Sequence, residues 1–189
     1  MPEKKAVPWS YANLWPFPVT TVMVSCMGKE RPPNIITIAA CGIASASPPL
    51  LSLAFAPTQY SLELMKEMGD FVVNIPSAEQ ATITDWCGSV SGRNVDKFTE
   101  GGLTPGKSLK VQSPYIAECP VNFECTLWQI VRCGIHDLVL GEIVQVHIDE
   151  DKLAPSGDRL DPTRLSPLIS YQMEYWDIGH AFGGWQKMK

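Results

Sequence analysis

The chain has 189 residues, of which 45% are hydrophobic and 19% are charged, and these proportions are ordinary for one globular domain with a substantial core. Its formal net charge of −5 gives no electrostatic reason to bind nucleic acid or an anionic membrane surface. An anionic ligand would therefore have to be held by local donors, such as helix amides and a few well-placed cations.

The N-terminal residues 1–18 carry charges and prolines but no continuous apolar segment, so we expect neither a signal peptide nor a membrane anchor there. No later run approaches the roughly 18–20 apolar residues that a membrane-spanning helix needs. The six cysteines form no CxxC pair of the kind found in zinc and redox sites. We interpret them as reduced, mostly buried thiols and predict a cytoplasmic protein.

The first part of the chain predicts three strands. Residues 19–26 are rich in β-branched side chains, and residues 34–40 form a similar run after the turn-rich segment 28–33, so the two should pair as a hairpin. Residues 41–49 are mostly small and end in two prolines, which predicts a loop. Residues 50–55 form the third predicted strand.

A first short helix is predicted after these strands. Ser61 is a suitable N-cap, and Gly69 is a suitable residue to close the C-terminal end. The apolar run 71–75 between turn signals then predicts a fourth strand.

A second short helix is predicted from a capping box. Ser77 and Gln80 have the required spacing, and the helix should run to about residue 88. The polar, glycine-containing segment 88–106 is predicted to be a loop that contains one helical turn.

The C-terminal half returns to a β pattern. Residues 122–131 and 136–148 are predicted strands joined by a turn at 133–134. In the second strand Val146 belongs to an apolar series and His147 to a polar one, so we expect Val146 to be buried and His147 to face water.

The remaining segments complete the predicted architecture. Residues 149–164 form a charged, proline-containing crossing segment, residues 167–176 are a last apolar piece, and residues 177–189 are unassigned. About six strands with only two short helices predict a β-barrel decorated by helices.

Five short segments follow one another in a recognisable order: 37–49 (TIAACGIASASPP), 55–61 (FAPTQYS), 71–76 (FVVNIP), 96–98 (DKF) and 134–143 (GIHDLVLGEI). Tyr175 and Trp176 add a closing aromatic motif. In this order the segments resemble the flavin reductase-like family of FMN-binding split barrels. The resemblance covers residues 19–176 of a single predicted domain, 1–189, with residues 177–189 as a tail.

The resemblance implies a mainly β fold, a six-stranded Greek-key split barrel with a few short helices, that forms a homodimer and binds FMN near the dimer interface. The small residues Ala39, Ala40 and Cys41 would let backbone amides approach the edge of a flat flavin ring and donate to its N5, O4 and O2 atoms. Without the flanking motifs, the same residues could simply fit a tight barrel interior. We interpret Cys41 as an ordinary buried thiol.

Four polar residues are candidate flavin ligands. Where the resemblance holds, Asn34 and Thr37 line the flavin; otherwise they are hydrogen-bonding residues at a hairpin end. Thr58 and Ser61 stand at the start of the first predicted helix, where free N–H groups and the helix dipole favour a phosphate. Ser61 could cap this helix and still contact an anion.

Arg93 and Lys97 are cations that could reach the phosphate or the pyrimidine edge of the flavin, where positive charge stabilises the anionic reduced ring. Loop charges are commonly just solvated, and the match of the DKF segment favours Lys97. In the family pattern, a histidine at the position of His136 faces the cofactor pocket. Without that pattern, His136 would be a turn or barrel-rim residue.

No dinucleotide-binding GxGxxG segment, phosphate-binding P-loop, nucleophile elbow or metal-binding spacing occurs in the sequence. NAD(P)H would therefore have to lie over the flavin in a shared groove. We predict an NAD(P)H-dependent flavin reductase that passes hydride from nicotinamide C4 to flavin N5 and needs no catalytic side chain. Two alternatives stay open: a flavoredoxin-like electron carrier with tightly bound FMN and a redox protein partner, or a non-catalytic ligand-binding split barrel.

Overall fold

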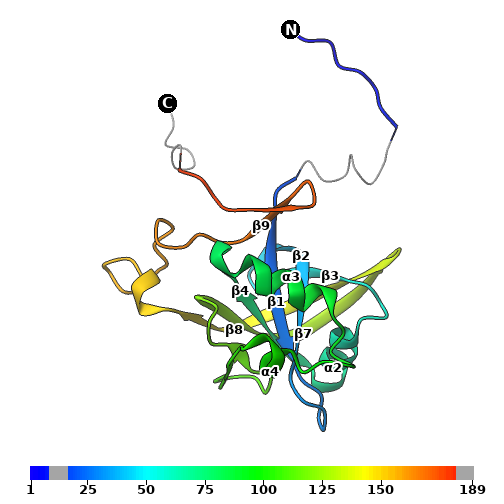
Figure 1. Cartoon of the computed structure of the whole chain (residues 1–189), viewed down its shortest axis with the longest axis vertical. Helices are drawn as coiled ribbons and strands as arrows, with labels where there is room; N and C mark the ends of the chain where they lie inside the picture. Colours follow the sequence, from blue (N-terminus) through cyan, green and yellow to red (C-terminus); the bar gives the residue numbers. More distant parts are fainter. Residues whose placement is uncertain (9–16, 182–189) are drawn as a thin grey trace.

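The computed structural model describes residues 1–8 and 17–181. Its centre is a closed, antiparallel six-stranded barrel in the order β1-β2-β3-β8-β7-β4, with β4 pairing back onto β1 (Figure 1). The connection from β3 to β4 runs through a helix and produces a Greek-key order, so the predicted fold class is confirmed. The barrel strands are β1 (Val19–Cys26), β2 (Asn34–Ala46), β3 (Pro49–Phe55), β4 (Asp70–Ile75), β7 (Val121–Cys133) and β8 (His136–Ile148).

Shorter elements decorate the barrel. Four short strands form two antiparallel pairs. Strand β5 (Pro105–Gly106) pairs with β6 (Tyr115–Ile116), and β9 (Ile169–Tyr171) pairs with β10 (Glu174–Trp176) as a hairpin. The helices are α2 (Tyr60–Met68), α3 (Ala81–Ser89), α4 (Lys97–Gly101) and the 3₁₀ turns η1 (Ala78–Gln80) and η2 (Glu150–Lys152). The predicted tail lies outside the described residues from residue 182 onward.

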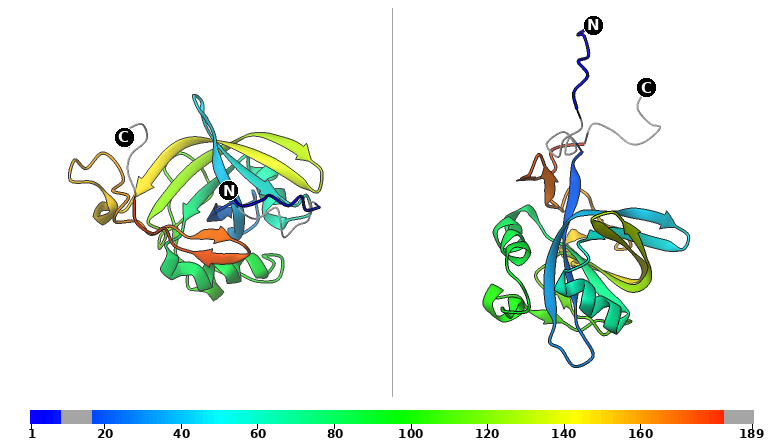
Figure 2. Two further views of the ribbon diagram at one scale, coloured as in Figure 1. Left: turned by 90° about the horizontal axis from the view of Figure 1, so that it is seen from above. Right: turned by 90° about the vertical axis from the view of Figure 1, so that its right-hand side faces the viewer.

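Strand β1 separates two apolar cores because alternate side chains of a strand point to opposite faces. The barrel interior holds Val22, Val24 and Cys26 together with large residues of the other strands, such as Leu53, Phe55 and Phe71. Met23 belongs to the second core, between the barrel wall and the helices, with Ile35, Cys87, Phe98, Leu103, Ile116 and Cys119. Figure 2 shows α3 and α4 on one side of the barrel. The second core therefore fixes these helices against β1 and β2.

The prediction of a loop over residues 41–49 is wrong. Strand β2 continues to Ala46 and pairs with β3, with a register irregularity between Ile43 and Ser45. Backbone hydrogen bonds from β3 hold this segment extended although its small side chains have little strand preference of their own. The resulting β2–β3 hairpin and the β7–β8 hairpin both extend on the side of the barrel away from α3 and α4 (Figure 2).

Two of the three predicted helix caps are confirmed. Gly69 closes α2 with a positive φ of 84°, and its N–H donates to the Met65 carbonyl at 2.8 Å. Ser77 and Gln80 form the predicted capping box. The prediction for Ser61 is wrong, because Gln59 is the N-cap and α2 begins at Tyr60. Ser61 is buried inside the first turn, where its Oγ accepts a hydrogen bond from Asn34 Nδ2 at 2.8 Å.

The predicted burial pattern at the end of β8 is also wrong. Val146 is exposed, whereas the imidazole of His147 is partly buried, lies 2.5 Å through Nε2 from Glu124 Oε1, and stacks on the Tyr115 ring. The reason is tertiary: residues 107–116 cover the strand face that local alternation alone would leave to water.

Two carboxylates hold this covering segment on the barrel. Glu124 of β7 accepts backbone N–H groups from Leu109, Lys110 and Val111 at 2.8, 2.6 and 3.2 Å. Asp70 of β4 accepts the backbone N–H group of Gln112 at 2.8 Å and that of Ser113 at 3.1 Å. Burial acts to raise the pKa of the Glu124 carboxyl, but hydrogen bonds from His147 and the backbone outweigh it and hold this pKa below its usual range.

We predict that Glu124→Gln lowers the free energy of unfolding by about 2–4 kcal/mol near pH 7, because an amide cannot accept all of these donors. The folded-state pKa of Glu124 is depressed below the ordinary value of 4.5. Its stabilising contribution is therefore complete above that value and is lost as the pH falls through the folded-state pKa. In urea denaturation, the difference in the free energy of unfolding between Glu124→Gln and the unmodified protein should become smaller below about pH 4.5.

The exposed Glu100 is the matched control, and Glu100→Gln should leave the free energy of unfolding almost unchanged at both pH values. A Glu124→Gln difference that stays constant from about pH 7 to about pH 3.5 would contradict the assigned role of the ionised carboxylate.

Candidate functional site

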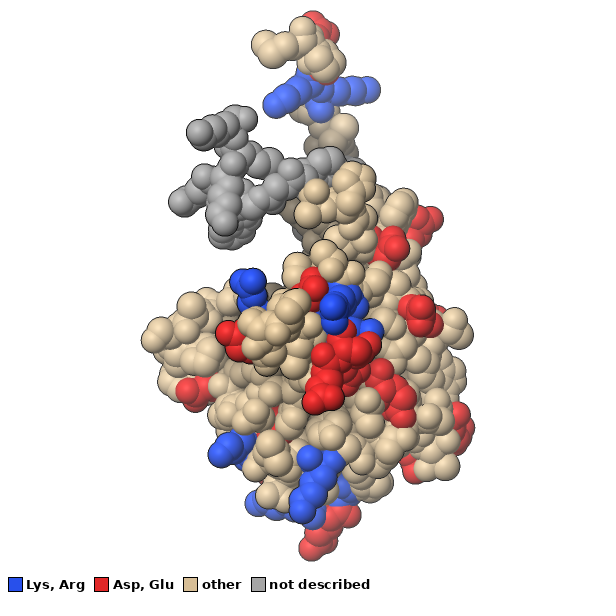
Figure 3. Space-filling model, turned by 90° about the vertical axis from the view of Figure 1, so that its left-hand side faces the viewer, with Lys and Arg blue, Asp and Glu red and all other residues tan. Residues whose placement is uncertain are grey.

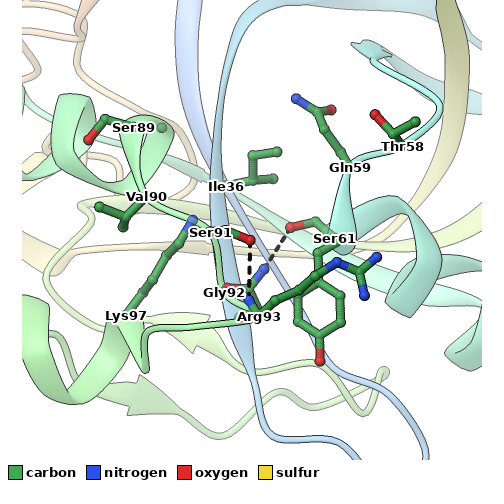
Figure 4. A pocket seen from close by; sticks show the side chains of 13 residues that line it. Ile36, Thr58, Gln59, Ser61, Ser89, Val90, Ser91, Gly92, Arg93 and Lys97 are labelled. Atoms are coloured by element: carbon green, nitrogen blue, oxygen red, sulfur yellow. Dashed lines mark hydrogen bonds between the residues drawn. The ribbon is translucent and has the colours of Figure 1, made fainter.

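A pocket of about 290 Å³ lies where β2, the start of α2 and the end of α3 meet (Figure 4). It contains five of the residues predicted from the sequence: Asn34, Thr58, Ser61, Arg93 and Lys97. The other lining residues are Ile36, Gln59, Tyr60, Gly88, Ser89, Val90, Ser91 and Gly92. Three chain segments that are distant in sequence thus supply one polar cavity.

The N-terminal end of α2 offers unpaired backbone donors to this pocket. The side chain of the N-cap residue Gln59 does not cap the helix, because its Oε1 accepts from the Ala56 N–H at 3.0 Å instead. Among the described residues, the amide groups of Tyr60 and Ser61 have no hydrogen-bond acceptor. Free amides at the positive end of a nine-residue helix favour an anion.

Asn34 contains a buried, unpaired acceptor. The residue is 3% exposed, and while Nδ2 donates to Ser61, Oδ1 has no donor among the described residues. A Cβ atom at Gly92 would lie 1.9 Å from this oxygen, so only glycine lets the segment after α3 pack so closely on β2. Gly92 thus covers this oxygen, and Asn34 contributes to the pocket by holding Ser61 in place.

Lys97 places a cation at the base of the pocket. It is 2% exposed, and its Nζ donates to the backbone carbonyls of Ile35 at 2.7 Å and Cys87 at 2.6 Å. An ammonium group has three donors, so one remains for a ligand. Asp96 caps α4 by accepting from the N–H groups of Phe98 and Thr99, which fixes the helix that carries Lys97. Burial lowers the pKa of the Lys97 ammonium group.

Arg93 lies at the edge of the pocket, from which its guanidinium reaches over the ring of Tyr60 at 4.7 Å from the ring centre. Figure 4 shows Arg93 beside Ser61, while Lys97 enters from the opposite side. The two cations therefore flank the space in front of the α2 amides.

The other predicted residues do not line this pocket. Thr37 lies next to it and donates its hydroxyl hydrogen bond to the Thr84 carbonyl. Ala39, Ala40 and Cys41 follow farther along β2, toward the extended hairpin. Burial raises the pKa of the Cys41 thiol to about 12, so this thiol stays protonated at neutral pH.

His136 is also separate from the pocket. It starts β8 opposite Cys133, beside the turn of the β7–β8 hairpin. The sequence-based reasoning missed several lining residues, among them Gln59, Tyr60 and the segment 88–92. For the segment 88–92, the available signal was a run of glycine and serine immediately after a predicted helix. Such small residues allow the backbone to approach a ligand closely.

Other parts of the molecule offer weaker candidates. A cavity of about 450 Å³ beside η1 is lined by acidic and basic side chains together, including Glu79, Glu118, Asp149, Lys152 and Arg164. Figure 3 likewise shows acidic and basic side chains next to each other on one face. Within residues 1–8 and 17–181, no group of His, Cys, Asp and Glu could hold a metal ion. None of the helices in the same ranges is long and apolar enough to span a membrane.

Comparison with known proteins finds relatives of the chain with flavin-related names. The model of the family described as flavin reductase like domain matches residues 14–179. An uncharacterized protein of Archaeoglobus fulgidus is 36% identical over 130 residues, which cover 69% of this chain and 72% of that protein. A protein of Streptomyces pristinaespiralis named NADH:riboflavin 5'-phosphate oxidoreductase is 27% identical over 158 residues, or 84% of this chain and 79% of that one.

The similarity extends to three dimensions. The solved structure of flavoredoxin from Desulfovibrio vulgaris (Miyazaki F) matches with a TM-score of 0.89 and 28% sequence identity, and the match covers 98% of each chain.

Proposed function

Because this chain belongs to the flavin reductase-like domain family, we propose that it binds FMN in the pocket at the start of α2 and acts as an NAD(P)H-dependent flavin reductase. The observation that carries the proposal is the combination of donors there: two free helix amides and the buried ammonium group of Lys97. A phosphate ester matches these donors.

Each group has a defined part in this proposal. The amides of α2, with Thr58 and Ser61, bind the phosphate, and Lys97 adds a positive charge. Asn34 lines the pocket and holds the Ser61 hydroxyl in place through Nδ2. Thr37 and the small residues Ala39, Ala40 and Cys41 continue along β2, where backbone can approach the edge of the ring.

The chemistry of the bound flavin is hydride acceptance at N5, and the chain's contribution is binding, orientation and electrostatics. His136 lies on a different hairpin, so the binding scheme within one chain leaves it out.

We also propose that the active form is a homodimer. A pocket of about 290 Å³ is at the small end for ligand sites, so one chain encloses only part of FMN. Ile43, Trp128 and Ile135 of the two extended hairpins are 83%, 52% and 77% exposed, and large exposed apolar side chains favour a protein contact. A second copy seated on these hairpins would cover them and the outer part of the flavin.

The likeness to flavoredoxin favours one alternative, a carrier that keeps FMN bound and exchanges electrons with a redox protein partner. The relative named as an NADH:riboflavin 5'-phosphate oxidoreductase favours the reductase, because riboflavin 5'-phosphate is FMN. The two differ in how fast the bound flavin reacts with a nicotinamide.

The visible absorption spectrum of the purified protein distinguishes these functions. We expect oxidised flavin bands after incubation with FMN, and rapid loss of these bands when NADH or NADPH is added without oxygen. Bands that persist until dithionite is added would identify the carrier instead. A protein that takes up no FMN would refute both and leave a split barrel that binds another ligand.

We predict that Lys97→Ala weakens FMN binding by about tenfold or more, because a charge-assisted hydrogen bond is lost. Fluorescence titration with FMN measures the affinity. Lys66→Ala is the control, because Lys66 is an exposed lysine of α2 that pairs with Asp137 and does not line the pocket. Unchanged affinity in Lys97→Ala would exclude Lys97 as a ligand.

We predict that the protein sediments at twice the mass of one chain and that Trp128→Glu shifts it toward the monomer, because a buried unpaired carboxylate opposes the contact. Leu109→Glu is the control, since Leu109 is also an exposed apolar residue, 68% against 52% for Trp128, and lies on the segment that covers Glu124 and not on the hairpins. Sedimentation velocity measures both variants. A Trp128→Glu protein that remains dimeric would place the interface elsewhere.

A further inference from the structure

The wall of the pocket contains an ion-pair cluster that the binding scheme above does not use. The ring of Tyr60, the first residue of α2, lies near two guanidinium groups, with Arg31 at 5.5 Å and Arg93 at 4.7 Å from its centre. Glu63, one turn farther along the helix, joins the same two arginines: Oε1 accepts from Arg31 and Oε2 from Arg93, each at 2.6 Å. The cluster thus connects the β1–β2 turn, α2 and the segment after α3.

This cluster fixes the position of Arg93. A solvent-exposed arginine normally has many accessible rotamers, but here one face of the guanidinium rests on Tyr60 and one edge binds Glu63. Its backbone N–H is also held, by Ser91 Oγ at 3.3 Å. Arg93 still lines the pocket, so the contact with Glu63 holds it beside the α2 amides and does not withdraw it from them.

Most donors of Arg93 remain available. A guanidinium group has five N–H donors, and the contacts of the described residues use one, from Nη2 to Glu63. The remaining donors suit a phosphate oxygen, for which arginine geometry is well adapted. A pre-ordered donor loses less conformational entropy on binding than a mobile one.

The charges of the cluster do not oppose an anion. Arg31 and Arg93 are balanced by Glu63 and by Glu67, which also accepts from Arg31. The guanidinium groups of Arg31 and Arg93 hold the pKa of the Glu63 carboxyl below its usual range, so this carboxylate is ionised at neutral pH. Because two cations share that carboxylate, little of its negative charge acts on the pocket.

We propose that Glu63 is a positioning residue: it holds Arg93 against Tyr60 as a ligand for a terminal phosphate, so that the site selects a flavin phosphate monoester over the same flavin without phosphate. This inference rests on the proposed FMN-binding function and names the chemical group by which that site recognises its flavin. Glu63 itself touches no ligand in this scheme.

The test compares the dissociation constants of FMN and riboflavin, measured by the change in flavin fluorescence on binding. We expect Glu63→Ala to weaken FMN binding by about five- to tenfold, which corresponds to the loss of an ordered donor. Riboflavin binding should change by less than about twofold, because it has no phosphate. A role in folding alone would weaken both flavins equally, so the ratio of the two constants is the readout.

Glu67→Ala is the matched control. Glu67 lies one turn after Glu63 on the same helix and pairs with Arg31, but it makes no contact with Arg93 among the described residues. This variant should leave the ratio unchanged. Glu63 is 47% exposed in its side chain, so its replacement should not prevent folding, and a thermal melt verifies this.

A double-mutant cycle tests whether Glu63 acts through Arg93. If it does, Glu63→Ala has no further effect on the FMN-to-riboflavin ratio once Arg93→Ala is present. An effect that persists in the Arg93→Ala background overturns the proposal, as does a Glu63→Ala protein whose ratio is unchanged or shifted in favour of FMN. Unmodified protein that binds neither flavin refutes the proposed function itself. FMN binding with an unaltered ratio in Glu63→Ala refutes the positioning role alone.

Discussion

The ammonium group of Lys97 joins α4 to two of the elements that build the pocket, β2 and α3. It extends from α4 and donates to a carbonyl of β2, through Ile35, and to a carbonyl of α3, through Cys87. A buried charge is tolerated only when it is well hydrogen-bonded, so this contact constrains the spacing of all three elements. The apolar core formed by Met23, Ile35 and Phe98 packs around the same junction. The cavity therefore depends on a cation that also faces its interior.

Polar groups of the barrel scaffold and of the pocket differ in their hydrogen-bond partners. In the scaffold, Asn74 donates to β1 and accepts from Asn122, and the carboxylates of Asp70 and Glu124 accept five successive backbone N–H groups. Thr84 Oγ1 of α3, outside the pocket, is buried without a partner, as is Asn34 Oδ1. The free first amides of α2 are the unpaired groups that open into the pocket, and they favour an anion.

The proposed scheme explains how such a barrel could support redox chemistry. Hydride transfer to a flavin requires that the ring be held, oriented and electrostatically biased, and each of these is a binding property. In this scheme the barrel would provide rigid strands for the ring, the start of α2 would provide amides for the phosphate, and the ion-pair cluster around Tyr60 would order a further donor. Catalysis would then follow from the geometry of binding.

The sequence by itself determined the features that depend on neighbouring residues. The β-branched run of β1, the positive φ at Gly69 and the capping box of Ser77 are local, because periodicity and cap chemistry act within a few residues. The family resemblance added the barrel topology. Tertiary structure alone decided that β2 continues to Ala46, that Ser61 binds Asn34 and not its own helix end, and that residues 107–116 bury Glu124. The contacts of Lys97 with Ile35 and of Arg93 with Glu63 join residues far apart in the chain. Local patterns carry no information about such pairs, since their geometry exists only once the barrel has closed.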